Sequence, residues 1–358
     1  MRKIDLLPGK EDNPRNSEGS MLEWKDGKII FIYSHFYGGK SDAAPAFLAA
    51  RFSYDKGETW TEKDEVIVEN EGKENVMSVS LLRLKNREII LGYVTKNSLK
   101  DCKYYMRKSK DEGKTWSEKV LVTNREFEEG NYFVVNNDRI IQLSSGRILV
   151  PASHHPCPTN KWEDFGPGRV VVFYSDDNGK TWKSGKTMLF APDKEDRAGL
   201  QEPGVVELKD GRILMWMRTH FGSQFFSYSE DGGETWSEAK PSDLISPCSP
   251  ASIKRIPETG DLFVVYNDRS GRFPIIEHEN GLKNRTPLVC AISKDEGKSW
   301  EKHFPIEDDP EGRFCYTSIL FVDSRVILSY SAAFSKQVWG LLRITLLTIE
   351  EIYGEKNT

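Results

Sequence analysis

Residues 53–60 read SYDKGETW, and four close copies of this octapeptide follow along the 358-residue chain. Every copy has Asp at its third position, Gly at its fifth and Trp at its eighth. This spacing predicts a tight turn in which the Asp side chain accepts backbone N–H bonds, the Gly takes positive φ and the Trp packs beneath. The other copies are SKDEGKTW at 109–116, SDDNGKTW at 175–182, SEDGGETW at 229–236 and SKDEGKSW at 293–300.

A second pattern runs out of phase with the first and consists of a strand, a short polar turn and another strand. It occurs six times, and a further β-rich segment precedes each octapeptide, so the units read as four-stranded antiparallel sheets. The six hairpins are MLEWKDGKIIFIYS at 21–34, SLLRLKNREIILGYV at 80–94, RIIQLSSGRILVPAS at 139–153, GVVELKDGRILMWMR at 204–218, SIKRIPETGDLFVVYN at 252–267 and SILFVDSRVILSYS at 318–331.

Repeated sheets of this size indicate an all-β fold, a six-bladed β-propeller in which each blade is buried against its neighbours. We expect residues 1–358 to form this propeller as one domain. The sixth unit lacks an octapeptide. The N-terminal segment RKIDLL at 2–7 is therefore expected to supply its missing strand and close the ring.

Charge and composition exclude several kinds of partner. The net charge is −5 and Lys and Arg form no long run, which argues against nucleic acid. No apolar stretch reaches the length of a membrane span, and no export signal is visible, so no membrane association is expected. The five cysteines stand far apart, without a CxxC pair, and fit a reducing cytoplasm. Since HExxH and phosphate-loop motifs are missing too, we expect neither a metal nor an organic cofactor.

Polar side chains gather at one end of the predicted ring. In an antiparallel blade, residues before the first strand, after the second and before the third share one end, whereas the octapeptide turns lie at the other. A lone polar residue at a sheet end is more often solvated or ion-paired than a ligand contact. The candidates at the shared end are Arg15, His35, Asp42, Asn136, Asn137, His154, Glu202, Arg218, Arg285 and Tyr316.

The octapeptides are Asp boxes, and together with the hairpins they make nearly the whole chain resemble the sialidase (neuraminidase) superfamily of six-bladed propellers. Five segments carry the site part of the resemblance: PRNSEG, SHFYGGKSDAAPAF, QEPGVVELKDGRILMWMR, NRTPLVCAISKDEGKSW and FCYTSILF. The resemblance implies a metal-independent site with Asp42 as acid/base, Glu202 as base, Tyr316 as nucleophile, and Arg15, Arg218 and Arg285 as arginines that bind the substrate.

These residues imply one reaction. Three arginines offer several N–H forks to one carboxylate, which lysines cannot match bidentately. Because the anomeric carbon of a sialic acid carries that carboxylate, a carboxylate nucleophile would approach against like charge, and sialidases use Tyr instead. The resemblance therefore implies a retaining exo-glycosidase that hydrolyses a terminal acidic sugar of the nonulosonic type.

Two other functions stay open at this point. His35, Asn136, Asn137 and His154 fall at the same end but lie outside the residues that the resemblance carries over. A His beside a carboxylate-binding Arg can act as acid or base, which suits a hydrolase or lyase for another acidic sugar such as a uronide. A non-catalytic propeller that binds acidic sugars is the third reading. An acidic carbohydrate is the expected partner in each case.

Overall fold

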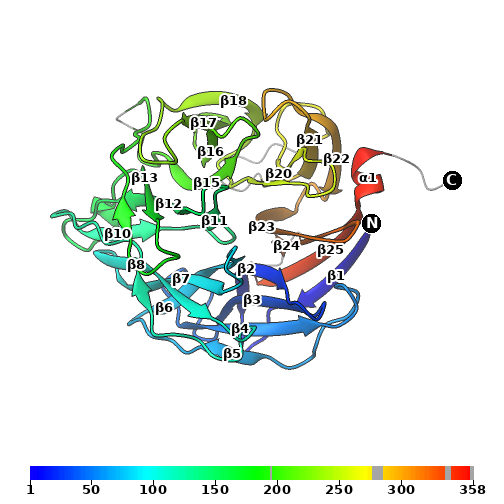
Figure 1. Cartoon of the computed structure of the whole chain (residues 1–358), viewed down its shortest axis with the longest axis horizontal. Helices are drawn as coiled ribbons and strands as arrows, with labels where there is room; N and C mark the ends of the chain where they lie inside the picture. Colours follow the sequence, from blue (N-terminus) through cyan, green and yellow to red (C-terminus); the bar gives the residue numbers. More distant parts are fainter. Residues whose placement is uncertain (194–195, 276–284, 335–339, 355–358) are drawn as a thin grey trace.

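The structure is a computed structural model that describes residues 1–193, 196–275, 285–334 and 340–354. It is all-β: helix among these residues is confined to the 3-10 turn η1 (Trp162–Asp164) and the short helix α1 (Ile349–Tyr353). In Figure 1 the sheets surround a common centre and the chain passes round it in sequence order. The blue N-terminal strands therefore lie beside the red C-terminal strands.

Four sheets have four antiparallel strands each, as the sequence pattern predicts. Each runs as a meander in which neighbours in sequence are neighbours in space, except in the sheet that contains both chain ends. Their strands are β2 (Arg15–Glu23), β3 (Ile29–Phe36), β4 (Ala46–Ser53) and β5 (Glu65–Val68); β15 (Gln201–Glu207), β16 (Ile213–Arg218), β17 (Ser223–Ser229) and β18 (Lys240–Ile245); β19 (Ser252–Arg255), β20 (Leu262–Asn267), β21 (Leu288–Ser293) and β22 (Glu301–Glu307); and β23 (Arg313–Val322), β24 (Arg325–Ala333), β25 (Leu341–Thr348) and β1 (Arg2–Leu7).

The fifth sheet has nine strands and contains two antiparallel groups. One parallel pairing joins the groups, with Tyr132 of β10 opposite Cys102 of β8. The strands of the first group are β6 (Asn75–Arg83), β7 (Ile89–Ser98), β8 (Asp101–Ser109) and β9 (Val120–Leu121), and those of the second are β10 (Asn131–Val134), β11 (Ile141–Gln142), β12 (Ile148–His155), β13 (Arg169–Ser175) and β14 (Lys183–Ser184).

All six hairpins expected from the sequence form antiparallel pairs: β2 with β3, β6 with β7, β11 with β12, β15 with β16, β19 with β20, and β23 with β24. The chain ends meet in one sheet, since β1 pairs antiparallel with β25 and Arg2 lies opposite Leu346. The N-terminal strand thus supplies the fourth strand beside β23–β25.

Apolar side chains fill the space between successive groups of strands. Ile32 and Leu48 pack with Val79 and Leu91 of the next group, and similar clusters continue along the chain. A final cluster packs Phe31 with strands β24 and β25, so the first and last sheets also share a core. Burying one such aliphatic or aromatic side chain is worth about 1.5–3 kcal/mol, so this continuous packing holds the ring together.

The octapeptide turns have the predicted geometry. In the first, the backbone N–H of Thr59 donates to Asp55 Oδ1 at 2.8 Å, Gly57 has φ 90° and Trp60 Nε1 donates to the Gly57 carbonyl at 3.0 Å. In the other four, the corresponding backbone N–H donates to the Asp at 2.9 Å. Each turn joins the third strand of its group to the segment that follows, which places these turns at the end remote from the candidate residues.

Candidate functional site

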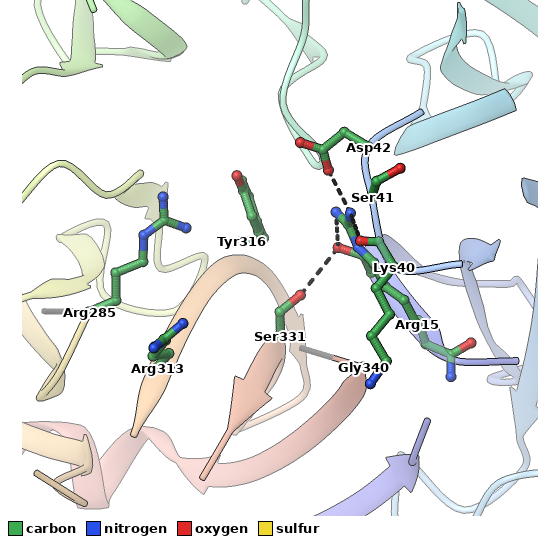
Figure 2. A pocket seen from close by; sticks show the side chains of 11 residues that line it. Arg15, Lys40, Ser41, Asp42, Arg285, Arg313, Tyr316, Ser331 and Gly340 are labelled. Carbon is green, nitrogen blue, oxygen red and sulfur yellow. Dashed lines mark hydrogen bonds and ion pairs between the residues drawn. The ribbon is translucent and has the colours of Figure 1, made fainter. Parts of the chain in front are cut away.

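Two adjoining cavities lie at the end of the ring opposite to the octapeptide turns. The first cavity has a volume of about 510 Å³ and the second about 290 Å³. Asp42, Arg285 and Tyr316 line both, so the two cavities meet at these three side chains. Figure 2 looks into the first cavity, with Arg285 on one side, Arg15 and Asp42 on the other and Tyr316 between them.

Strand bulges deliver four of the lining side chains. The first strands β2, β6, β15 and β23 each contain a β-bulge, where the first strand has one more residue than the partner strand opposite it. In each bulge a non-glycine residue has positive φ: Glu18 at 52°, Ser78 at 59°, Glu202 at 45° and Tyr316 at 61°. Such backbone costs an L-residue about 1–2 kcal/mol and persists where the surrounding structure enforces it. All four residues line the cavities, so the bulges serve to aim side chains into them.

Tyr316, Glu202 and Arg218 form a connected row. Tyr316 Oη donates to Glu202 Oε1 at 3.2 Å, and Arg218 Nη1 donates to Glu202 Oε2 at 2.9 Å. Burial and the nearby Glu202 charge raise the pKa of Tyr316, so its phenol is neutral near pH 7. The side-chain amide of Asn137 holds the backbone of Tyr316 in place, because it donates to the Tyr316 carbonyl at 3.1 Å.

Asp42 lies across the cavity in the segment between β3 and β4 and pairs with Arg15. Arg15 Nη1 donates to Asp42 Oδ1 at 2.5 Å and to the Lys40 carbonyl at 3.1 Å, while Nη2 lies 3.3 Å from Glu18 Oε1. Partial burial opposes ionisation of Asp42, but the charge and hydrogen bond of Arg15 outweigh it and lower its pKa. Asp42 is therefore ionised while Arg15 holds it.

The other two arginines each donate to a buried thiol. Arg218 Nε donates to Cys248 Sγ at 3.1 Å, and Arg285 Nη1 donates to Cys315 Sγ at 3.0 Å. Burial raises the pKa of Cys315 to about 11, even though Arg285 opposes the shift, so this thiol is neutral near pH 7. A neutral thiol fixes the orientation of a guanidinium without cancelling its charge.

The three predicted arginines lie along the joined cavities. Arg15 lines the first cavity, Arg218 lines the second, and Arg285 borders both. Asp42, Glu202, Tyr316 and Asn136 also line at least one of the two cavities.

The structure does not bring His35 or His154 into the described lining of either cavity. His35 Nδ1 lies 2.9 Å from Asp64 Oδ2, and its ring stacks on Phe47 with 4.4 Å between centroids. His154 stacks on Phe127 at 4.0 Å, and burial lowers its pKa. Both residues lie at the cavity end of their strands, β3 and β12, as their sequence positions indicate. Their rings, however, pack against Phe47 and Phe127 and do not reach the described cavity lining.

Asn75 and Lys96, which the sequence patterns did not single out, hold the segment that carries Asp42. Asn75 Nδ2 donates to the carbonyls of Asp42 and Ala44, both at 2.9 Å. Lys96 Nζ donates to the Asp42 carbonyl at 3.1 Å and pairs with Glu74 Oε2 at 3.1 Å. The side chain of Lys96 is only 1% exposed. The lysine that follows the apolar run IILGYV in β7 was the available signal.

Within the described part of the chain, no group of three or more His, Cys, Asp or Glu side chains is placed to hold a metal ion. Nor does this part contain a helix that is long and apolar enough to cross a membrane.

Fold and site together define a sialidase-like β-propeller. Comparison with solved structures supports the fold. A protein of unknown function from Dyadobacter fermentans DSM 18053 superposes with a TM-score of 0.77 at 18% identity, and the match covers 97% of this chain and 98% of that protein. The leech intramolecular trans-sialidase in complex with 2,7-anhydro-Neu5Ac has a TM-score of 0.76 and 16% identity, covering 99% of this chain and 71% of its own.

The family follows from the sequence comparisons. The BNR repeat-like domain matches residues 36–328, and the chain belongs to this family within the sialidase superfamily. The sialidase of Bacteroides fragilis (strain YCH46) is 25% identical over 224 residues, which cover 62% of this chain and 38% of that protein. The sialidase of Paraclostridium sordellii is 28% identical over 260 residues, covering 65% and 60%. The match thus spans less than two thirds of either relative.

Proposed function

We propose that the chain is a retaining exo-glycosidase of the sialidase type, which hydrolyses a terminal acidic sugar of the nonulosonic class. One observation carries the proposal: Tyr316 donates to Glu202 in a cavity whose wall also includes Asp42 and arginines. A nucleophile within hydrogen-bond reach of a base, with an acid in the same wall, is the arrangement that covalent glycosyl transfer needs.

The first step forms a glycosyl-enzyme. Tyr316 Oη attacks the anomeric carbon while Glu202 accepts its proton, which is necessary because the raised pKa keeps the phenol neutral. The glycosidic bond breaks, and Asp42 in its protonated form gives its proton to the leaving oxygen. Arg218 lies 2.9 Å from Glu202 and holds this base in place.

The second step hydrolyses the intermediate. Ionised Asp42 removes a proton from water, the water oxygen attacks the anomeric carbon, and the phenolate leaves and recovers its proton from Glu202. Two displacements at one carbon give retention. A substrate carboxylate that binds Arg15 competes with Asp42 for the same guanidinium, so substrate binding raises the pKa of Asp42 and favours its acid form.

The placement of the histidines disfavours the uronide alternative. A uronide hydrolase or lyase built on His35 or His154 needs one of these imidazoles at the substrate, and neither belongs to the described lining of the cavities. A non-catalytic sugar-binding propeller has no need of the Tyr316–Glu202 hydrogen bond or of the two strained bulges that create it.

We also propose that the described strands form one six-bladed propeller. The two antiparallel groups of the nine-stranded sheet count as separate blades, and the four-stranded sheets supply the other four. The apolar cluster shared by the first and last sheets supports closure of the ring.

A fluorogenic sialoside tests the function. We expect turnover by the wild type, and a loss of about 10²-fold or more in kcat for Tyr316→Phe and Asp42→Ala. Tyr54→Phe is the matched control, because Tyr54 is 72% exposed in an octapeptide turn. Nuclear magnetic resonance of the first-formed anomer tests retention. Unchanged activity in Tyr316→Phe refutes the nucleophile. Sugar binding without turnover identifies a non-catalytic propeller, and activity on uronides alone identifies the rival enzyme.

A further inference from the structure

Two cations line the first cavity without a partner in the described part of the chain. Arg313 lies at the start of β23, three residues before Tyr316, and no hydrogen bond or ion pair to its guanidinium occurs among the described residues. The same holds for the ammonium of exposed Lys40, whose carbonyl, in contrast, accepts from Arg15. Figure 2 shows Arg313 beside Arg285 on one side of the cavity and Lys40 on the other.

Cations outnumber anions among the described residues that line the first cavity. The charged side chains in this described lining are Arg15, Lys40, Arg285, Arg313 and Asp42. Asp42 is already bound to Arg15, which also faces Glu18. Concave surfaces with one sign of charge concentrate counter-charged ligands, and arginine binds carboxylate and sulfate oxygens through paired N–H groups.

Arg313 lines the first cavity and is not part of the described lining of the second. The reacting sugar belongs where the two cavities meet, because Tyr316 and Asp42 line both and Glu202 lines the second. Arg313 instead faces the first cavity, where the hydroxyls of Ser17 and Ser331 lie 3.4 Å apart. At about 510 Å³ this cavity is large enough for a further part of a ligand.

We propose that the first cavity is a second anion subsite, in which Arg313 and Lys40 bind an acidic group other than the carboxylate of the reacting sugar. This inference rests on the proposed function. It makes the preferred substrate doubly acidic: the acidic sugar is linked to a neighbour that bears a carboxylate or a sulfate ester, and both groups share the chemistry that arginine recognises.

Three substrates test the subsite. They are 3′-sialyllactose with a neutral leaving sugar, α2,8-disialyllactose with a carboxylate on it, and 6-sulfated 3′-sialyl-N-acetyllactosamine with a sulfate. We expect the wild type to favour an acidic substrate about tenfold in kcat/KM. Arg313→Gln should remove most of this preference and Lys40→Gln a smaller part, whereas Lys298→Gln in the fifth octapeptide turn should leave it unchanged. The preference should also shrink in 0.5 M salt, since both cations are reached by solvent.

The ratio between substrates separates the outcomes. Preference for the disialylated substrate identifies a carboxylate as the second group, and preference for the sulfated one identifies a sulfate. Equal wild-type kcat/KM values for the three substrates overturn the subsite. So does a fall in kcat/KM of Arg313→Gln that is equal for neutral and acidic substrates.

Calorimetry separates failure of the subsite from failure of the glycosidase. If the wild type hydrolyses none of the three substrates, the proposed activity is wrong, and binding of α2,8-disialic acid is compared with binding of the monomeric acid. Tighter binding of the dimer, lost in Arg313→Gln, supports the subsite without catalysis. Equal binding of the two acids refutes it.

Discussion

Tyr316 Oη donates to Glu202 Oε1 at 3.2 Å although β23 and β15 belong to sheets separated along the chain by the β19–β22 sheet. Both residues occupy positive-φ bulges, at 61° and 45°. In Figure 1 both strands lie beside the centre of the ring, so this contact joins two strands that belong to different sheets. Backbone strain of this kind clusters at active sites and ligand-binding sites, so strain at both ends of one hydrogen bond supports the proposed role of this pair.

Replacing Glu202 by Gln should separate its base role from its packing role. The amide keeps the shape of the carboxylate but cannot accept the Tyr316 proton, so kcat should fall about 10²–10⁴-fold near pH 7 with little change in KM. The Glu202 charge raises the pKa of Tyr316, so the variant should have a lower phenol pKa. Activity should then recover partly at alkaline pH as phenolate forms, measured as rate and as absorbance at 295 nm across pH.

Two controls accompany this pH profile. Tyr316→Phe should show no alkaline recovery because it has no phenol to ionise, and Glu230→Gln, an exposed change in an octapeptide, should match the wild type. A Glu202→Gln profile parallel to that of the wild type would rule out Glu202 as the base.

Lys96→Met should act on catalysis through Asp42. The substitution removes the donor to the Asp42 carbonyl and a cation that helps to lower the Asp42 pKa. We expect kcat/KM to fall about tenfold, and the pH-rate limb assigned to Asp42 to move to higher pH. Breaking the pair with Glu74 should also cost about 1–3 kcal/mol of unfolding free energy, since that carboxylate is partly exposed.

Lys96→Arg provides the comparison, because it retains a cation and donors to the carbonyl. Its pH limb should stay near that of the wild type even if stability falls. A loss of activity in Lys96→Met without any displacement of the limb would indicate a structural role alone.

The fold was predictable because its signals are local. Each Asp box encodes its own turn within eight residues, and each hairpin encodes its strands by alternation about a polar turn, so Asp55 or Gly57 can be interpreted without distant residues. The parallel pairing of Tyr132 with Cys102, which merges two groups of strands into one sheet, has no such local signal.

The site was predictable only to the level of which end each residue reaches. Side-chain direction depends on neighbouring sheets: His154 turns onto Phe127, whereas Tyr316 reaches the cavity because its backbone is forced to positive φ. Lys96 and Arg313 were missed for a related reason, since a lysine or arginine in a strand gives no sequence sign of the partner that it has or lacks. Their roles depend on packing between blades.

Glu18 should make stability depend on pH. Burial raises its pKa from 4.5 to about 7, although Arg15 opposes the shift. Between these values the folded protein keeps a proton that the unfolded chain has released, so this group reduces stability as pH rises through the window. At about 1.4 kcal/mol per unit, the effect is about 3 kcal/mol. The free energy of unfolding of Glu18→Gln, measured with urea, should therefore rise relative to that of the wild type by this amount between pH 4.5 and pH 8.

Exposed Glu62→Gln serves as the control for that series and should follow the wild type at every pH. A constant difference between Glu18→Gln and wild type across the window would show that Glu18 does not hold the extra proton.

Asp177→Asn should weaken the fold and spare the chemistry. Asp177 accepts from the Thr181 backbone N–H at 2.9 Å and hydroxyl at 2.7 Å; partial burial opposes ionisation, but these bonds lower its pKa to about 2. Its contribution is therefore complete above about pH 4 and is lost as pH falls through about 2. The variant should lose about 1–2 kcal/mol of unfolding free energy at pH 7, and less near pH 2.5.

Because this turn lies at the end remote from Tyr316, kcat/KM of Asp177→Asn should stay within twofold of wild type below its unfolding temperature. Gly179→Ala in the same turn should also lower stability, since Gly179 has φ 77°, a backbone conformation that an L-residue adopts only with strain. Thermal unfolding and sialoside turnover measured on the same samples test the separation. A fall in activity that exceeds the fall in folded fraction would mean that the octapeptide end and the cavity end are coupled through the blades.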